Sequence, residues 1–322
     1  MPTILLTNSY ETDVIEFVMT QVPEGFDLIS LSSNNKEELI EKAPKADYFI
    51  VSGRLSIDKE VIDAAKKLKM IQRTGVGVDQ IDLNLLRERN IPLYVNKGVN
   101  AQAVAEHTLL LMLAVYRKLP IADSLLKDGV WRKQSFGIQT RSLYNKTVGL
   151  IGLGNIGLEL VKLLQPFDVN ILYHKRTQLN SEDERKYGLT FVSKNEVLEN
   201  SDVISLMCSY TPKTHHILNE DNFALMKPES ILVNTARGKL IDQRALIEAL
   251  KYNRILGVGL DVHYSEPLDE HHGYNSLENI VLTPHIGGIT RESFSEMYKK
   301  AFQNITLFHS GSINKTHKNR YT

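Results

Sequence analysis

Short runs of apolar residues alternate along this chain with longer stretches in which apolar residues recur at helical spacing. Most of the short runs are apolar at successive positions, so both of their faces would be buried, as in a parallel sheet with helices on each side. The predicted strands are residues 3–7, 48–52, 93–96, 147–151, 170–173, 202–207, 231–234, 255–260 and 280–282. The pattern therefore predicts an α/β fold of doubly wound parallel sheets.

Two of the longer stretches predict helices. Residues 101–116 carry almost no charge after Glu106 and His107, which predicts a buried helix of about four turns, suited to crossing between two domains. Near the C-terminus a second amphipathic helix is expected, and Thr290 is placed to cap it. Its apolar positions are Phe294, Met297, Tyr298, Ala301, Ile305 and Phe308.

The run GLGNIG at residues 152–157 follows the predicted strand at 147–151 and opens a helical pattern. Gly152 would allow the tight turn, Gly154 would let the backbone approach a pyrophosphate, and Gly157 would let the helix pack closely on the strand. The free amides and positive dipole end of that helix favour a phosphate. This context predicts a dinucleotide site. Because such a domain starts with the strand that feeds the glycine run, most of the first hundred residues should form a separate unit.

Position 174, where a dinucleotide fold usually carries an acidic residue, is a histidine followed by two cationic residues. An Asp or Glu there accepts hydrogen bonds from the adenosine ribose of NAD and repels a 2′-phosphate, whereas cationic side chains accommodate that phosphate. His174, Lys175, Arg176 and Thr177 therefore predict NADP(H) as the cofactor, with NAD(H) as the alternative.

Three predicted strands in the second half of the chain end in polar residues that suit one reaction. Arg237, Glu266 and His285 each follow one of these strands, and open α/β sheets bind ligands beyond the carboxyl ends of their strands. A carbonyl that receives hydride builds negative charge on its oxygen, which an imidazolium can protonate. A carboxylate on the other ring nitrogen would orient that imidazole, and the rigid arginine fork can grip a substrate carboxylate. The three residues together predict reduction of a 2-oxo acid.

Over essentially its whole length the chain resembles the D-isomer-specific 2-hydroxyacid dehydrogenases. Seven short segments carry this resemblance. They are RTGVGVD at 73–79, the stretch 100–106 with its Val-Ala-Glu ending, GVW at 129–131, GLGNIG at 152–157, NTARG at 234–238, the stretch 260–267 with its Leu-Asp-Val and Glu-Pro, and TPHIGG at 283–288.

The resemblance implies roles for particular residues. Arg237, Glu266 and His285 match the catalytic residues of the family, and the amides around Val76 and Gly77, with Arg237, would hold the substrate carboxylate. The other matches concern the cofactor: Gly152, Gly154, Asn155, Ile156 and Gly157 at the pyrophosphate, and Cys208, Thr214, Thr235 and Asp261 at the nicotinamide half.

The resemblance also implies how the domains are arranged. A Rossmann dinucleotide-binding domain, residues 101–289, would be inserted into a discontinuous flavodoxin-like substrate-binding domain formed by residues 1–100 and 290–322. The inserted domain would build a homodimer.

Two departures from the common family pattern narrow the expected activity. The sequence at 174–176 replaces the acid of NAD-dependent members and, with CSYTP at 208–212, is similar to NADP-using glyoxylate/hydroxypyruvate reductases. The loop at 52–56 lacks the Arg-Ser pair common in phosphoglycerate dehydrogenases, which disfavours a phosphorylated substrate. We therefore expect NADPH-dependent reduction of glyoxylate, hydroxypyruvate or a related 2-oxo acid to the D-2-hydroxy acid.

Other activities stay as alternatives because a fold does not determine a function. One is an NAD(H)-dependent D-lactate- or phosphoglycerate-type dehydrogenase. Another is a dinucleotide-sensing protein that resembles the transcriptional corepressors of this fold. A formate- or phosphite-type oxidising dehydrogenase is disfavoured by the residues at 174–176 and by the overall match to the family's motifs.

Composition sets further limits. Lys+Arg and Asp+Glu both number 38, so no net field attracts nucleic acid or an anionic membrane. The single cysteine suits a reducing compartment, and the longest apolar run, residues 109–116, is too short to span a bilayer. The histidine pairs at 215–216 and 271–272 are adjacent rather than four residues apart, which disfavours a metal site. We expect a cytoplasmic protein without nucleic-acid, membrane or metal partners.

Overall fold

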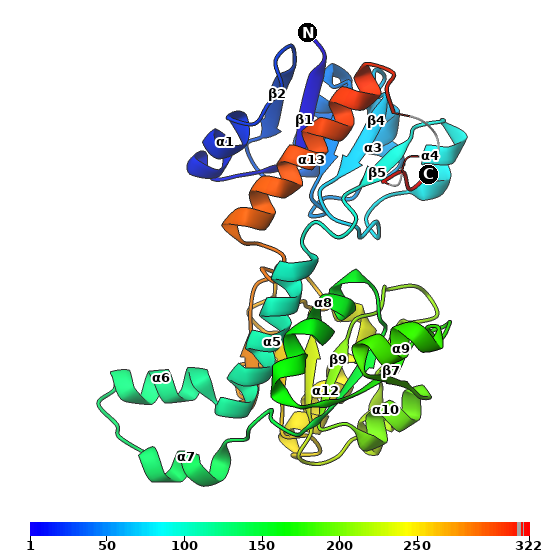
Figure 1. Cartoon of the computed structure of the whole chain (residues 1–322). Helices are drawn as coiled ribbons and strands as arrows, with labels where there is room; N and C mark the ends of the chain where they lie inside the picture. Colours follow the sequence, from blue (N-terminus) through cyan, green and yellow to red (C-terminus); the bar gives the residue numbers. More distant parts are fainter. Residues whose placement is uncertain (314–316, 318) are drawn as a thin grey trace. The chain divides into compact units, whose positions relative to one another are not determined.

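The computed structural model describes residues 1–313, 317 and 319–322. The chain divides into two compact units, Met1–Asn100 with Arg291–Thr322, and Ala101–Thr290 (Figure 1). The first unit is therefore discontinuous in sequence. Each unit contains one parallel sheet, which confirms the predicted α/β class.

The first unit is built on a five-stranded sheet in the order β2-β1-β3-β4-β5, which is the flavodoxin-like order. Its strands are β1 (Thr3–Ser9), β2 (Asp27–Leu31), β3 (Tyr48–Val51), β4 (Met70–Arg73) and β5 (Leu93–Val95). Its helices are α1 (Thr12–Met19), α2 (Lys36–Lys42), the short 3-10 helix η1 (Ala43–Lys45), α3 (Lys59–Ala64), α4 (Leu83–Glu88) and α13 (Arg291–His309).

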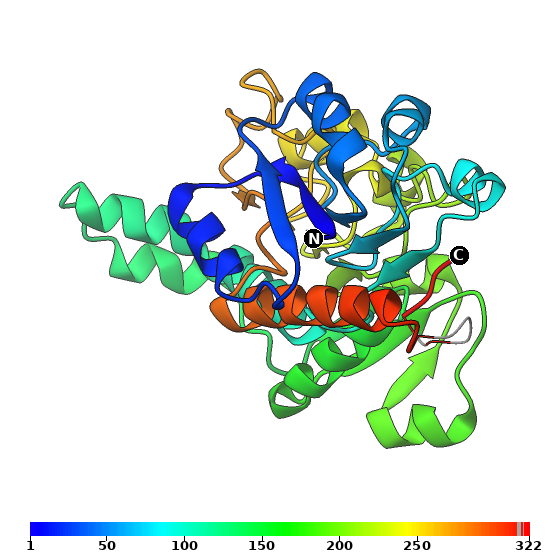
Figure 2. The same cartoon turned by 90° about the horizontal axis from the view of Figure 1, so that it is seen from above.

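Apolar clusters cover both faces of this sheet. Ile4 and Tyr48 pack on one face with Phe302 of α13, while Leu5 and Phe49 pack on the other face with residues of α3 and α4. The C-terminal helix α13 thus lies against the strands of the N-terminal unit and completes its core (Figure 2).

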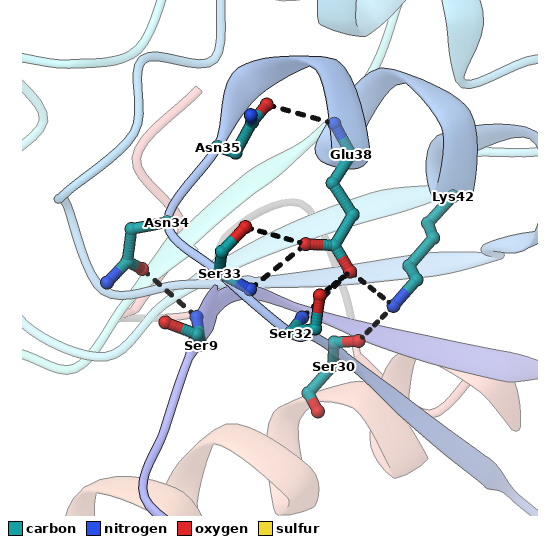
Figure 3. A network of polar contacts seen from close by, with 8 residues as sticks. All are labelled: Ser9, Ser30, Ser32, Ser33, Asn34, Asn35, Glu38 and Lys42. Atoms are coloured by element: carbon teal, nitrogen blue, oxygen red, sulfur yellow. Dashed lines mark hydrogen bonds and ion pairs between the residues drawn. The ribbon is translucent and has the colours of Figure 1, made fainter.

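The turn between β2 and α2 is held by one carboxylate (Figure 3). Glu38 accepts hydrogen bonds from the amides of Ser32 at 2.7 Å and Ser33 at 3.0 Å, and from Lys42 Nζ at 2.7 Å. The Lys42 hydrogen bond, followed by that of the Ser32 amide, lowers the pKa of Glu38 to about 2. These contacts stabilise the turn fully above the ordinary pKa of a glutamate, and their contribution is lost as the pH falls toward the lowered value.

The second unit has a seven-stranded sheet in the order β12-β11-β10-β9-β6-β7-β8. This is the Rossmann order with one added strand, and its switch point lies between β6 and β9. The strands are β6 (Thr147–Ile151), β7 (Asn170–His174), β8 (Leu189–Phe191), β9 (Val203–Leu206), β10 (Ile231–Asn234), β11 (Gly257–Leu260) and β12 (Ile280–Leu282).

Helices cover both faces of the second sheet. On one face Met112 of α5 and Leu160 of α8 pack with Leu150, and on the other Val197 of α10 and Leu246 of α12 belong to a second cluster. The helices of this unit are α5 (Ala101–Arg117), α6 (Leu119–Lys127), α7 (Lys133–Gln139), α8 (Asn155–Leu164), η2 (Gln165–Phe167), α9 (Ser181–Tyr187), α10 (Lys194–Asn200), α11 (Glu220–Leu225), η3 (Gly238–Leu240) and α12 (Gln243–Lys251).

Helices α6 and α7 contribute no buried residue, as is also the case for α9 and η2. Helices α6 and α7 extend away from the second sheet as an arm (Figure 1). We call residues 119–139 the arm.

All nine runs predicted as strands are strands, but β2, β4 and β8 were missed. In β4 the polar Gln72 is fully buried because Asn304 donates to its side-chain oxygen at 2.9 Å and its own amide donates to Asn96 at 3.2 Å. Strands β2 and β8 lie at sheet edges, where partly exposed residues weaken the apolar pattern. The predicted helices correspond to α5 and α13, and no helix in the described part of the chain is long and apolar enough to cross a membrane.

Candidate active site

The glycine run forms the turn between β6 and α8. Gly152 has φ +95°, and a Cβ on it would lie 2.5 Å from the backbone nitrogen of Cys208, so only glycine fits. A Cβ on Gly154 would meet nothing within 4 Å. The backbone there is open to a ligand, and no side chain caps α8 at Gly154. This open turn with an uncapped helix of 10 residues fits the pyrophosphate of a dinucleotide.

The third glycine, Gly157, makes room for a side chain of the turn itself and not for close packing of α8 on β6. A Cβ on Gly157 would lie 2.9 Å from Cδ1 of Leu153, which belongs to the same turn. Asn155 and Ile156, the first two residues of α8, lie between Gly154 and Gly157 and place their amides at the open end of the helix.

The adjacent strand β7 ends at His174, whose carbonyl accepts from the Gly152 amide at 2.8 Å. Its ring stacks on Phe191 with an interplanar angle of 22°. Lys175 is half-buried, while Arg176 and Thr177 are exposed. Within the described residues neither cation forms a hydrogen bond or an ion pair. Both positive charges are therefore available to an anionic ligand.

Glu266 and His285 form a direct pair beyond β11 and β12. His285 Nδ1 lies 2.7 Å from Glu266 Oε2, and the amide of His263 donates to Glu266 Oε1 at 2.9 Å. Burial alone would raise the pKa of Glu266, but the hydrogen bond and charge of His285, with the His263 amide, hold it below its usual value. An ionised Glu266 only accepts hydrogen bonds, so the proton between the two residues belongs to His285 Nδ1.

Arg237 follows β10, which pairs with β11. Its Nη1 donates to the Ala236 carbonyl at 2.6 Å, and its own carbonyl accepts from Asn234 at 2.9 Å. A Cβ on the next residue, Gly238, would lie 2.0 Å from the carbonyl of His263, so the Arg237 loop packs against the segment that carries Glu266. The predicted catalytic residues thus follow three neighbouring strands at one edge of the sheet.

Asp261 holds the loop that carries His285. It is 2% exposed, and it accepts from the Thr283 hydroxyl at 2.6 Å and from the Ile286 and Gly287 amides at 2.9 and 2.8 Å. Burial would raise the pKa of Asp261, but these donors and His107 lower it. The backbone of His285, at φ +56°, is thus fixed on both sides. This role was not predicted, and contact between Asp261 and the nicotinamide stays a prediction.

His107 of α5 completes this arrangement. Its Nε2 lies 2.9 Å from the Thr283 hydroxyl, which donates its own proton to Asp261, so Nε2 is the donor. His107 and Thr283 are 176 residues apart in sequence, and no local pattern indicates the contact.

The other predicted cofactor residues follow β9 and β10. Burial raises the pKa of the Cys208 thiol to about 11, so it is protonated and unsuited to attack as a thiolate. The Thr214 hydroxyl donates to Ser209 and closes its own loop, while the Thr235 hydroxyl lies 2.8 Å from that of Thr108 on α5. Their contacts with a nicotinamide stay predictions.

Val76 and Gly77 lie in the first unit, after β4. Arg73 holds this loop: its Nε donates to the Gly77 carbonyl at 2.8 Å and its Nη1 to the Val51 carbonyl at 3.0 Å. A Cβ on Gly53 would lie 2.5 Å from the Arg73 guanidinium, so the same side chain also contacts the loop after β3. Arg73 is a positioning residue that the sequence showed only as part of a motif.

Comparisons with known proteins show the family to which the chain belongs. A family model described as the NAD binding domain of the D-isomer specific 2-hydroxyacid dehydrogenases matches residues 109–287. Glyoxylate reductase from Pyrococcus furiosus is 36% identical over 290 residues, covering 88% of this chain and 86% of the relative.

Two further relatives extend the comparison. D-3-phosphoglycerate dehydrogenase from Archaeoglobus fulgidus is 36% identical over 291 residues, covering 90% of this chain but 54% of the relative, so the chain spans about half the length of that protein. The crystal structure of TT0316 protein from Thermus thermophilus has a TM-score of 0.88 and 34% identity, covering 99% of this chain and 100% of that chain.

Proposed function

Because the chain belongs to the D-isomer specific 2-hydroxyacid dehydrogenases, a family of NAD(P)-dependent enzymes, we propose that it uses NADPH to reduce a small 2-oxo acid to the D-2-hydroxy acid. The observation that carries this proposal is the 2.7 Å contact between His285 and Glu266 at the sheet edge that also bears the open glycine turn.

His285 is the proton donor of the proposed reaction. Its Nδ1 proton is held by Glu266, so Nε2 is the nitrogen left to face a substrate oxygen. When bound in its reduced form, the nicotinamide would supply the hydride. As negative charge develops on the substrate oxygen, Nε2–H of the imidazolium protonates it, and the Glu266 carboxylate stabilises the charged ring until then.

Arg237 and the amides around Val76 and Gly77 hold the substrate carboxylate in this proposal. An arginine fork can pair with both carboxylate oxygens, which fixes the position of C2 as well as the charge. Arg73 supports the same function indirectly, since it holds the Gly77 carbonyl and so orients the neighbouring amides.

The preference for NADPH rests on the end of β7. Replacing Lys175 and Arg176 together by alanine is expected to weaken NADPH binding by about 10- to 100-fold, because charge-assisted hydrogen bonds to a phosphate contribute about 1.5–3 kcal/mol. NADH binding should change little. Fluorescence titration with each cofactor measures both affinities.

A matched control separates this effect from a general loss of positive charge. Lys186→Ala removes an exposed charge from α9, where the ammonium lies over the Tyr187 ring. It should leave both affinities unchanged. If wild-type protein binds NADH more tightly than NADPH, the proposed cofactor preference is wrong.

The substrate class is tested by steady-state kinetics. Glyoxylate, hydroxypyruvate, pyruvate and 3-phosphohydroxypyruvate are supplied with NADPH and with NADH, and kcat/KM is compared. We expect the highest value for glyoxylate or hydroxypyruvate with NADPH. A preference for the phosphorylated acid would favour the phosphoglycerate-type alternative, and oxidation of neither cofactor with any acid would favour a cofactor-sensing protein.

We also propose that the protein is a homodimer formed through the arm. Leu126, Trp131 and Ile138 of the arm are 58%, 76% and 81% exposed, and burying large apolar side chains in an interface is favourable. Trp131→Glu combined with Ile138→Glu is expected to convert the dimer to monomers in sedimentation velocity at micromolar concentration. Tyr252→Glu, an exposed aromatic outside the arm, should stay dimeric. A monomeric wild-type protein would contradict the proposal.

A further inference from the structure

The ring of His174 is held in one orientation at the end of β7. Nδ1 lies 3.0 Å from the Val192 carbonyl, and a carbonyl oxygen only accepts hydrogen bonds, so Nδ1 carries a proton in either charge state of the ring. Stacking on Phe191 holds the plane of the ring. Only Nε2 is left to change its protonation.

Among the described residues, no group forms a hydrogen bond with Nε2. This atom is also not fully buried, so a ligand can reach it. Neutral histidine presents Nε2 as an acceptor, and protonated histidine presents it as a donor. The same atom can therefore bind two opposite types of group.

The two nicotinamide cofactors differ in this way at one position. The adenosine ribose of NAD carries a 2′-hydroxyl, which can donate a hydrogen bond, whereas NADP carries a 2′-phosphate, which accepts. The residue at the end of the second Rossmann strand is placed to meet this position, and the His174 backbone is bonded to Gly152 of the pyrophosphate turn at 2.8 Å.

We propose that His174 recognises both cofactors by changing the role of Nε2, so that NADP binds with uptake of a proton by His174 and NAD binds to the neutral ring. The proposal rests on the proposed function at this site. His174 would then be a specificity-determining residue that responds to pH. Its role would go further than the lack of an acidic residue that repels the 2′-phosphate.

We expect the proton to be taken up by His174 rather than by a neighbouring charged group. Strands β6 and β8, which flank β7, carry no titratable side chain. Helix α10 packs against β7 and carries Lys194, Glu196 and the exposed Glu199. Lys194 donates to the Ile217 carbonyl, and Glu196 accepts from the Ser193 amide. Lys175 and Arg176 are the cations next to His174 in the chain. They add to phosphate binding at every pH at which they are charged.

The test is calorimetric titration of the whole protein with NADP⁺ and with NAD⁺ between pH 5.5 and 8.5, without substrate. Wild type is compared with His174→Gln, which keeps a donor and an acceptor but cannot be charged. For NADP⁺, the ratio of the wild-type to the variant dissociation constant should rise about three- to tenfold from low to high pH. For NAD⁺ the ratio should fall. Protonation of the phosphate on the free cofactor, near pH 6, is common to both proteins and cancels in the ratio.

Proton uptake is a second measurement in the same experiment. Titrations in buffers of different ionisation enthalpy should show more protons taken up with NADP⁺ by wild type than by His174→Gln. His271→Gln, which changes an exposed histidine far along the chain, should behave as wild type. His174→Asn provides a second uncharged variant, and melting temperatures show that each variant is folded.

The outcomes separate this inference from the proposed function. Parallel pH dependence in wild type and His174→Gln, with equal proton uptake, overturns the role of His174 even when NADP⁺ binds tightly. If NADP⁺ binds no better than NAD⁺ at any pH while the two proteins still diverge, the cofactor preference fails and the role of His174 stands.

Discussion

His285→Ala is expected to lower kcat by about 10²–10⁴-fold, the usual contribution of a positioned proton donor. The side chain is 49% exposed and its ring bonds to Glu266, so its removal leaves no cavity in either core. NADPH affinity should stay close to wild type because no role in cofactor binding is assigned to the imidazole. Steady-state kinetics with the best 2-oxo acid and a fluorescence titration measure the two quantities.

Two further variants define the role of this residue. Glu266→Gln keeps a side chain of the same shape but cannot stabilise a protonated ring. The decline of the reduction rate on the alkaline side of the pH profile should therefore begin at a lower pH than in the wild type. His271→Ala removes an exposed histidine and should have no effect. Retention of more than about a tenth of the wild-type kcat by His285→Ala would exclude His285 as the proton donor.

Gly154→Ala is expected to weaken cofactor binding while leaving the fold intact. A Cβ at this position meets no protein atom within 4 Å, and the residue has φ −112°, which alanine adopts readily. The methyl group would occupy the space through which a pyrophosphate approaches the turn. We expect the dissociation constant for NADPH to rise at least about tenfold, which corresponds to about 1.4 kcal/mol.

The neighbouring glycine provides the contrast. Gly152→Ala places a methyl group 2.5 Å from the Cys208 backbone at a positive φ, so it should lower the melting temperature as well as cofactor affinity. Gly137→Ala on α7, also without a neighbour within 4 Å, should leave cofactor affinity unchanged and should not lower the melting temperature, because alanine is favoured over glycine inside a helix. Normal NADPH binding by Gly154→Ala would show that no phosphate lies against this turn.

The strands that were predicted and those that were missed differ in what buries them. Strands such as β6 and β10 consist mostly of consecutive apolar residues because both of their faces are covered. The pattern is therefore local and can be recognised in the sequence. Strand β4 contains Gln72, whose burial depends on Asn304 of α13, 232 residues away. A polar residue that is satisfied by a distant partner cannot be distinguished in sequence from a polar residue in a loop.

The candidate site shows the same division. Arg237, Glu266 and His285 could be selected because each is a chemically suited residue directly after an apolar run, and strand ends in a parallel sheet share an edge. The contacts of Asp261 and His107 with the His285 loop could not be selected. They depend on how α5 packs against β10, β11 and β12.

The sequence by itself determined the α/β class, most strands, the glycine turn and the residues suited to hydride and proton transfer, because these depend on local apolar pattern and on residue chemistry. Only the tertiary structure decided which hydrogen bonds those residues make. Because the Val192 carbonyl accepts a hydrogen bond from His174 Nδ1, only Nε2 is left to bind a ligand. Because Glu266 lies 2.7 Å from His285 Nδ1, the proton of that ring has a defined place. Such roles arise where strands and loops that are distant in sequence meet, and these contacts leave no local pattern in the sequence.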